Sequence, residues 1–219
     1  MKVKFSFLII ALILVNLSFI SAEIIISQPS IVYNYGDNLK IQAIVSPSRD
    51  SSGFFELNLA CGEENNFYRQ YFTLKQTEKK TIDAEILLLP SFTSTGNCRV
   101  KADFSSEHKK SADFIISNQI NLVLYEYDSN VEAGKSILIS GNATKENGKA
   151  AKGFYELTLE NSSILATGEV DSSFTINFSF PYNAKSQDYT GKLRVYDGLY
   201  GEVTNQGSSY LSFRVGQTP

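Results

Sequence analysis

The side chains best suited to chemistry in this 219-residue chain are two cysteines, Cys61 and Cys98. Cys61 closes an alternating, β-prone run that begins at Gly53, and Cys98 opens another run just after a Thr-Gly-Asn turn. In an exported chain, two cysteines favour a disulfide. The alternatives are two buried free thiols or half of a metal site, although a zinc site needs more Cys or His ligands than these two.

The other candidates for catalysis or metal binding are few. The single histidine, His108, lies in a polar hairpin where the sequence supplies no partner for a general base. Asp37 and the pair Glu63-Glu64 could contribute to a calcium site, but their spacing matches no calcium-binding loop. No nucleophile elbow, phosphate loop, zinc motif or pair of glycosidase carboxylates stands out. We therefore expect a non-enzymatic protein with no cofactor and no metal.

Tyrosines near the expected loops could stack on sugars. They are Tyr182, Tyr189, Tyr196 and Tyr200. Tyrosines in such places are more often half-buried strand ends. Tyr189 also occupies the place of a tyrosine corner, just before the penultimate strand of its module.

After the hydrophobic segment 1–22, the sequence contains three Asn-X-Ser/Thr sequons, which begin at Asn142, Asn161 and Asn177. Their number is what chance would give, but all three fall in the second half of the chain, and Asn142 and Asn177 are on the outward phase of their expected strands. N-glycosylation at these sites is a hypothesis that depends on a host with the machinery for it.

A hydrophobic leader opens the chain. Residues 1–22 combine two lysines near the start, an apolar run from Phe5 to Ile20 and a Ser-Ala pair before Glu23, which is typical of a cleaved signal peptide. An uncleaved N-terminal anchor is the alternative, although the run is slightly short for a bilayer span. Either way we expect export to the cell envelope or the extracellular space, with membrane contact only if the leader is retained.

Charge argues against one class of partner. The formal net charge is −3, and removal of the two leader lysines leaves 18 basic against 23 acidic side chains, or −5. A mildly acidic chain without a basic patch is not expected to bind nucleic acid.

The remaining residues form two copies of one pattern. Gly53–Cys61 recurs as Gly153–Asn161, with the same alternation and an offset of 153 − 53 = 100 residues. The turn around Tyr35-Gly36-Asp37 recurs as Ala133-Gly134-Lys135. Because the landmarks keep their order, spacing and face, we interpret the halves as a duplication.

Short alternating strands with turn signals every 8–15 residues predict an all-β fold of two tandem immunoglobulin-like β-sandwiches. We assign residues 23–117 to the first module and 118–219 to the second. Ser117-Asn118-Gln119 leaves almost no linker between them, which predicts a semi-rigid rod. In such a sandwich the third and penultimate strands are antiparallel neighbours, so Cys61 and Cys98 should meet.

These turns, together with Gly-Phe-Phe/Tyr-Glu-Leu and Thr-Gly-X-X-Arg-Val, make the chain resemble the immunoglobulin-like or macroglobulin-type β-sandwich repeats of prokaryotic surface proteins, archaeal ones in particular. The resemblance covers roughly residues 23–215 and implies no functional residue. It implies a stalk, spacer or adhesive module.

We therefore expect an exported, non-enzymatic protein that acts as a cell-surface spacer or protein-interaction module. One alternative is a carbohydrate- or ligand-binding adhesive module, and another is an accessory module of an exported enzyme. An envelope protein or a glycan is the expected kind of partner.

Overall fold

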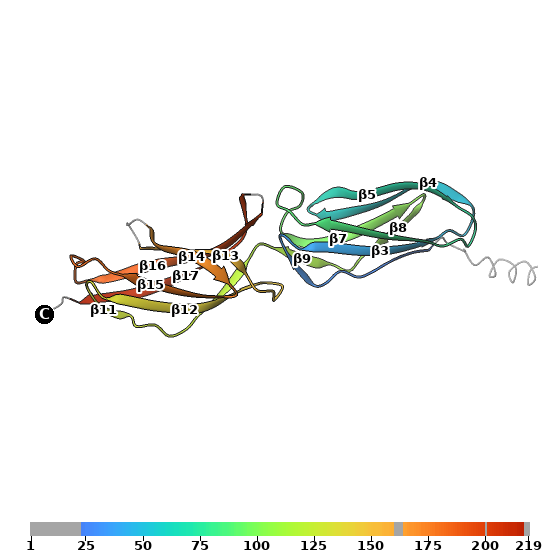
Figure 1. Ribbon diagram of the computed structural model, residues 1–219. Coiled ribbons are helices and arrows are strands. Elements are labelled where there is room, and N and C mark those ends of the chain that lie inside the picture. The colour runs from blue at the N-terminus through green and yellow to red at the C-terminus, as the bar shows by residue number, and fades with distance from the viewer. Residues whose placement is uncertain (1–22, 160–163, 200, 217–219) are drawn as a thin grey trace, which may run out of the picture.

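The computed structural model describes residues 23–159, 164–199 and 201–216, and its regular elements in these ranges are all β-strands (Figure 1). The described residues include no helix with the length and apolar character needed to cross a membrane. The predicted signal segment, residues 1–22, lies outside the described residues.

The first module contains nine described strands. They are β1 (Glu23–Ile26), β2 (Val32–Asn34), β3 (Asn38–Ser46), β4 (Ser51–Cys61), β5 (Glu63–Leu74), β6 (Lys80–Leu87), β7 (Gly96–Phe104), β8 (Glu107–Lys110) and β9 (Phe114–Ser117). One sheet has the order β1-β3-β6 and the other has the order β2-β9-β7-β4-β5, with β8 attached to β7.

The second module contains eight described strands. They are β10 (Ile120–Leu124), β11 (Asn130–Glu132), β12 (Ser136–Lys145), β13 (Lys152–Leu159), β14 (Ile164–Asp171), β15 (Ser173–Ser179), β16 (Asp188–Leu199) and β17 (Glu202–Gly216). Their order is β10-β12-β15-β14-β13-β16-β17-β11. Only the pair Asp171 and Ser173 joins β14 to β15. This order therefore consists of a three-stranded set, β10-β12-β15, and a five-stranded set, β14-β13-β16-β17-β11, which are connected by that one pair.

The strand order is the same in both modules. The set β10-β12-β15 repeats β1-β3-β6, and β14-β13-β16-β17-β11 repeats β5-β4-β7-β9-β2. Each module also has one parallel pairing, β2 with β9 and β11 with β17. This arrangement confirms the predicted fold class, an all-β chain with two immunoglobulin-like sandwiches.

Alternation along the repeated stretch sets which side chains enter the cores. On β4, Phe55, Leu57 and Leu59 are completely buried, whereas Phe54 points outward. The buried apolar residues form two clusters, one spanning Ile24 to Ile116 and one spanning Ile120 to Val215. Each module therefore has its own core, and the two lie end to end (Figure 1).

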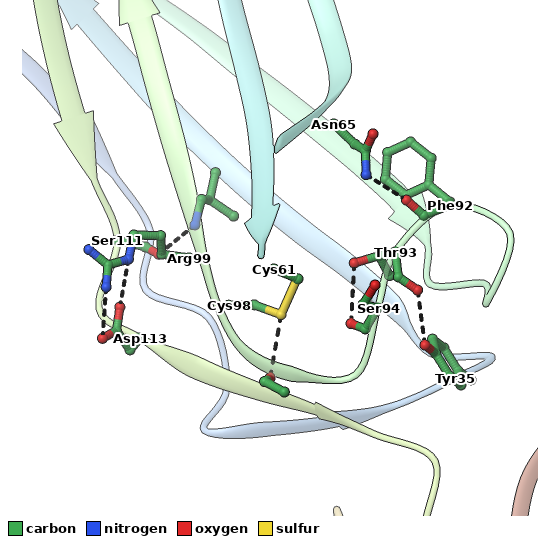
Figure 2. Close-up of a disulfide and its surroundings, with 12 residues drawn as sticks. Tyr35, Cys61, Asn65, Phe92, Thr93, Ser94, Cys98, Arg99, Ser111 and Asp113 are labelled. Atoms are coloured by element: carbon green, nitrogen blue, oxygen red, sulfur yellow. Dashed lines mark hydrogen bonds and ion pairs between the residues drawn. A yellow bond between two sulfur atoms is a disulfide. The ribbon is translucent and has the colours of Figure 1, made fainter. Parts of the chain in front are cut away.

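The predicted disulfide between Cys61 and Cys98 is confirmed (Figure 2). The two Cα atoms are 4.3 Å apart, and the bridge joins the end of β4 to the start of β7, its neighbour in the same sheet. Antibody domains instead carry a bridge between sheets. The cross-link thus fixes the two central strands of one sheet.

Two local features of the sequence mislead. The polar residues that follow Cys61 interrupt the β-prone pattern and predict a break, but residues 63–66 belong to β5, because Gly62, with φ of +85°, turns the chain directly into a hairpin. The amides in this strand find partners: Asn65 donates to the Phe92 carbonyl, and Asn66 donates to Asn58. Strand β14 was not predicted, because its apolar alternation is weak. The ring of Tyr155 occupies the space that a side chain at Gly168 would fill.

Replacing both cysteines by serine should lower the free energy of unfolding of the first module by about 4 kcal/mol, because the bridge closes a sequence separation of 37 residues. Urea denaturation monitors this loss. Reduction of the wild-type protein should reproduce it while leaving the transition of the cysteine-free second module in place. An unchanged midpoint for the first module would contradict a stabilising bridge.

Candidate functional site: the junction between the modules

The sequence-selected polar residues do not gather into one site. His108 Nδ1 lies 2.5 Å from Asp103 Oδ1 on the exposed β7–β8 hairpin. Glu64 pairs with Lys101 on β7, whereas Asp37 lies at the boundary between the modules. Among the residues that the structure describes, no group of three or more His, Cys, Asp or Glu side chains is placed to hold a metal ion.

The tyrosines also separate. The Tyr189 hydroxyl donates to the Lys185 carbonyl at 3.2 Å, which is the geometry of a tyrosine corner. Tyr182 is 88% exposed and its ring covers Gly134, and Tyr196 is half-buried. Tyr200 and the sequon residue Asn161 lie outside the described residues.

The largest concentration of buried polar side chains is the junction between the modules. Strand β9 ends at Ser117 and β10 begins at Ile120, so only two residues connect the sandwiches. The turn between β2 and β3 then faces the turn between β12 and β13 and the β16–β17 hairpin. We call the residues that meet there the junction: Asn34, Tyr35, Asp37, Lys145, Asn147, Lys149, Asp197, Thr204 and Asn205.

Asn34, at the end of β2, is completely buried and directs its whole side chain at the second module. Its Nδ2 donates to the Gln119 carbonyl and to Asn205 Oδ1, both at 3.1 Å. Its Oδ1 accepts the Asn147 backbone N–H at 3.0 Å. One amide of the first module thus contacts the linker, a turn and a strand of the second.

Asp37 supplies the charge on the first-module side. Its carboxylate accepts from Asn147 Nδ2 and from Lys149 Nζ, each at 2.6 Å. It also accepts the Asn34 backbone N–H at 2.8 Å, which closes the turn that presents both side chains. The Asp37 side chain is only 9% exposed, whereas the Lys149 stem reaches in from solvent.

On the second-module side, Asn205 and Asp197 form the matching half. Asn205 is completely buried, and its Nδ2 lies 2.9 Å from the Tyr35 carbonyl and within 3.0 Å of both Asp197 carboxylate oxygens. Asp197 also accepts from Thr204 Oγ1 at 2.6 Å and pairs with Lys145 Nζ at 2.6 Å. Asn205 therefore connects a buried ion pair to the backbone of the first module.

Backbone hydrogen bonds hold the two-residue linker against the second module. The Gln206 N–H donates to the Asn118 carbonyl, and the Glu146 N–H donates to the Gln119 carbonyl. Gly207 permits the close packing of β17 against the start of β10, since a Cβ there would lie 1.9 Å from the Ile120 carbonyl oxygen. Gly36 has φ of +87° and lies beneath Leu199 of the second module.

The junction is neutral and fully bonded. It places two carboxylates, Asp37 and Asp197, against two ammonium groups, Lys149 and Lys145. No buried side-chain nitrogen or oxygen among the described residues lacks a hydrogen-bond partner. A network of this kind adds little net stability, but any other orientation of the modules would separate Asp37 from Lys149 and Asn34 from its partners, which is costly.

The Asp197 carboxyl group, which forms the ion pair of the second module, has an altered proton affinity. Burial alone would raise the pKa of Asp197, but hydrogen bonds from Lys145, Thr204 and Asn205, together with the Lys145 charge, outweigh burial and hold that pKa below its ordinary value. The carboxylate thus stays ionised inside the junction at neutral pH.

Aromatic–arginine pairs occupy the outer faces of both five-stranded sets. Arg69 lies over Phe54 at 4.0 Å from the ring centroid, and Phe54 packs edge-on against Tyr71. In the second module Arg194 lies over Tyr196, which packs against Phe154, the equivalent of Phe54. Phe54 and Phe154 are about half exposed, whereas Arg194 and Tyr196 are half-buried. Both pairs contribute modestly to the stability of each sheet.

Sequence reasoning missed most of the junction. Asn34, Asn147 and Asn205 were not singled out for any role, and Asp37 was considered only as part of a turn and as a possible calcium ligand. The available signal was the short linker, which required the two ends to touch, and the polar composition of the turns on either side of it.

Comparisons with known proteins identify only distant likenesses. No protein family and no curated protein matches the chain. A β-glucosidase from Listeria innocua, solved in complex with glucose, matches 44% of this chain at 13% identity and a TM-score of 0.35. A mutant of Salmonella alpha-2-macroglobulin matches 89% of this chain at 11% identity and a TM-score of 0.33.

The chain spans only 16% of that glucosidase and 15% of that macroglobulin. Likenesses at such TM-scores say nothing about activity, and the immunoglobulin-like description of both modules rests on their own strand order. The relation to macroglobulin-type repeats and the archaeal source therefore stay predictions.

Replacing Asn205 by alanine should lower the free energy of unfolding by about 2 kcal/mol or more, because it removes the side-chain donor to the buried Tyr35 carbonyl and one acceptor of the buried Asn34 amide. The neighbouring substitution Gln206→Ala, at an exposed side chain, should cost less than about 0.5 kcal/mol. Urea denaturation compares the two variants, and equal losses would contradict a special role for Asn205.

The Asp197 contribution should also depend on pH. A pKa that is lower in the folded chain than in the unfolded chain gives stability that is complete above the unfolded value, near 4, and is lost as pH falls through the folded value. The stability difference between wild type and Asp197→Asn should therefore be constant from pH 7 to 5 and shrink in more acidic buffer. A difference that stays constant to the lowest measurable pH would contradict this assignment.

Proposed function

We propose that the chain is an exported, non-enzymatic protein whose two sandwiches act as a semi-rigid spacer or protein-interaction module at the cell surface. The observation that carries the proposal is the junction. Asn34, Asp37 and Asn205 connect the modules through buried hydrogen bonds, so the pair behaves as one elongated body.

The composition of the junction favours a fixed angle over a flexible hinge. A flexible connection needs an exposed linker of several residues and a small, wet interface. Here the linker is two residues long, and both sides present buried groups whose partners lie in the other module. Bending would expose or unpair an ionised carboxylate, so the relative orientation is part of the folded structure.

Export is supported by the bridge and the leader. Disulfides persist in oxidising compartments, and Cys61 and Cys98 form one. The apolar run between Phe5 and Ile20 is typical of a signal segment. Together they favour a location in the envelope or outside the cell.

Ligand binding is a second candidate, favoured by the aromatic–arginine pairs. Phe54 and Phe154 occupy equivalent positions and are 47% and 50% exposed. A glycan or an envelope protein could contact both rings. Loss of retention on cell-wall material in a Phe54→Ala, Phe154→Ala variant with an unchanged unfolding midpoint would favour this role over a purely spacing one.

The spacer proposal predicts a single distance between the modules. Spin labels at the exposed positions Lys40→Cys and Lys192→Cys should give one narrow distance distribution by pulsed electron paramagnetic resonance. Adding Asp37→Ala and Asn205→Ala should broaden it, because these changes remove the contacts that fix the angle.

The matched control is Asp171→Ala, which removes an exposed ion pair with Lys152 inside the second module and should leave the distribution narrow. A broad distribution in the otherwise wild-type chain would refute a rigid spacer. Fractionation of source cells tests export separately, and recovery in the cytosol would contradict it.

A further inference from the structure

The three-stranded outer face of the second module lacks charge. Its outward side chains on β10, β12 and β15 are hydroxyl, amide or aliphatic: Asn121, Val123, Ser136, Leu138, Ser140, Asn142, Thr144, Ser173, Thr175, Asn177 and Ser179. Two of the aliphatic side chains are prominent, since Val123 is 58% exposed and Leu138 is 59% exposed. A solvent-exposed sheet face normally carries a mixture of charges.

The same face of the first module provides the comparison. There Lys40 pairs with Glu85, and Gln42 donates to Asp83 across β3 and β6. The two modules share this sheet order, so fold geometry does not require an uncharged face. The difference belongs to the second module alone.

Both described sequons lie on this uncharged face. Asn142 and Thr144 on β12 are exposed, as are Asn177 and Ser179 on β15. Because side chains two residues apart in a strand point the same way, each asparagine amide and its sequon hydroxyl lie on the same side of the sheet.

Each sequon asparagine is directly opposite one of the two exposed aliphatic residues. Asn142 pairs with Val123 across β10 and β12, and Asn177 pairs with Leu138 across β12 and β15. Opposite residues have Cβ atoms about 5 Å apart, so a group attached to either amide starts beside an uncovered apolar side chain. Leu138 and Asn142 are four residues apart, about 13 Å along the strand, which leaves room for two attached groups.

We propose that Asn142 and Asn177 both carry N-linked glycans, whose first sugars cover Val123 and Leu138. In the transfer, the asparagine amide nitrogen bonds to the anomeric carbon of a lipid-linked sugar donor. The bond from that carbon to the donor phosphate breaks, the phosphate leaves with its lipid, and the amide gives up one proton. A membrane-bound transferase of the host performs this step.

Sugar chemistry fits the face. The C–H surfaces of a pyranose ring cover aliphatic groups, while its hydroxyls find partners in the serine and threonine side chains around them. Uncharged hydroxyl neighbours accommodate a neutral glycan without burying a charge, which would be costly. The equivalent outer face of the first module is charged, so a glycan attached there would bury charged side chains at a cost in desolvation. That face carries no sequon.

The proposal requires that the second module cross a membrane, and its test has two arms. The first maps glycopeptides from protein purified from its source, and the second maps the chain secreted by a eukaryotic host under that host's own signal peptide. Both arms should show glycan mass at Asn142 and at Asn177. Thr144→Ala should remove the first glycan and Ser179→Ala the second, although both asparagines remain.

The matched control is Asn121→Gln, at an exposed asparagine of the same face outside any sequon, which should leave the mass of the attached glycan unchanged. Glycan-free protein from bacteria should bind more of a hydrophobic dye than the glycosylated form, and Val123→Gln with Leu138→Gln should remove the excess. Source protein recovered outside the cytosol with either asparagine unmodified would overturn the proposal while leaving export intact. Equal dye binding by both forms would overturn the covering role.

Discussion

The arrangement of the whole chain depends on one constraint, which is that the buried polar groups of each module find partners in the other. Asn34 and Asp37 leave the first sandwich at a single turn, and Asn147, Lys149 and Asn205 meet them from the second. Neither half is satisfied alone, because the Asn34 side chain has all its described hydrogen bonds across the boundary. The relative orientation of the two modules is therefore set by these hydrogen bonds and ion pairs, and the hydrophobic cores on either side do not have to determine it.

Much of the fold could be predicted from the sequence because its signals are local. Alternation placed Phe55, Leu57 and Leu59 in the core, glycine turns marked Gly36 and Gly134, and the duplicated order anticipated identical sheets. The Cys61–Cys98 bridge followed from strand adjacency. Strand β14 was missed because part of its packing consists of a ring lying over the bare backbone of Gly168, which leaves no apolar alternation to read. The junction was missed because the junction residues that bond across the boundary are 85 or more positions apart in sequence, and nothing about an isolated asparagine shows what it will meet.

The two copies have diverged where their surroundings differ. The positions of Asn34 and Asp37 in the first module are held by Glu132 and Lys135 in the second, so the equivalent turn of the second module does not repeat this amide and carboxylate. Gly134 is covered by Tyr182 of its own module, whereas Gly36 is covered by Leu199 of the next. The shared framework thus tolerates different contacts at its ends, and it is the end residues, more than the cores, that distinguish the modules.

The parallel pairings have a mechanical consequence. In each module a strand near the start of the module lies parallel to its last strand, β2 beside β9 and β11 beside β17. Tension applied along the chain pulls such partners in opposite directions along their length. The ladder is then loaded in shear, so its hydrogen bonds bear the force together instead of opening one after another. The bridge removes the residues between Cys61 and Cys98 from any extension. A protein built this way holds its length under load, as an attachment exposed to flow or to a moving partner would require.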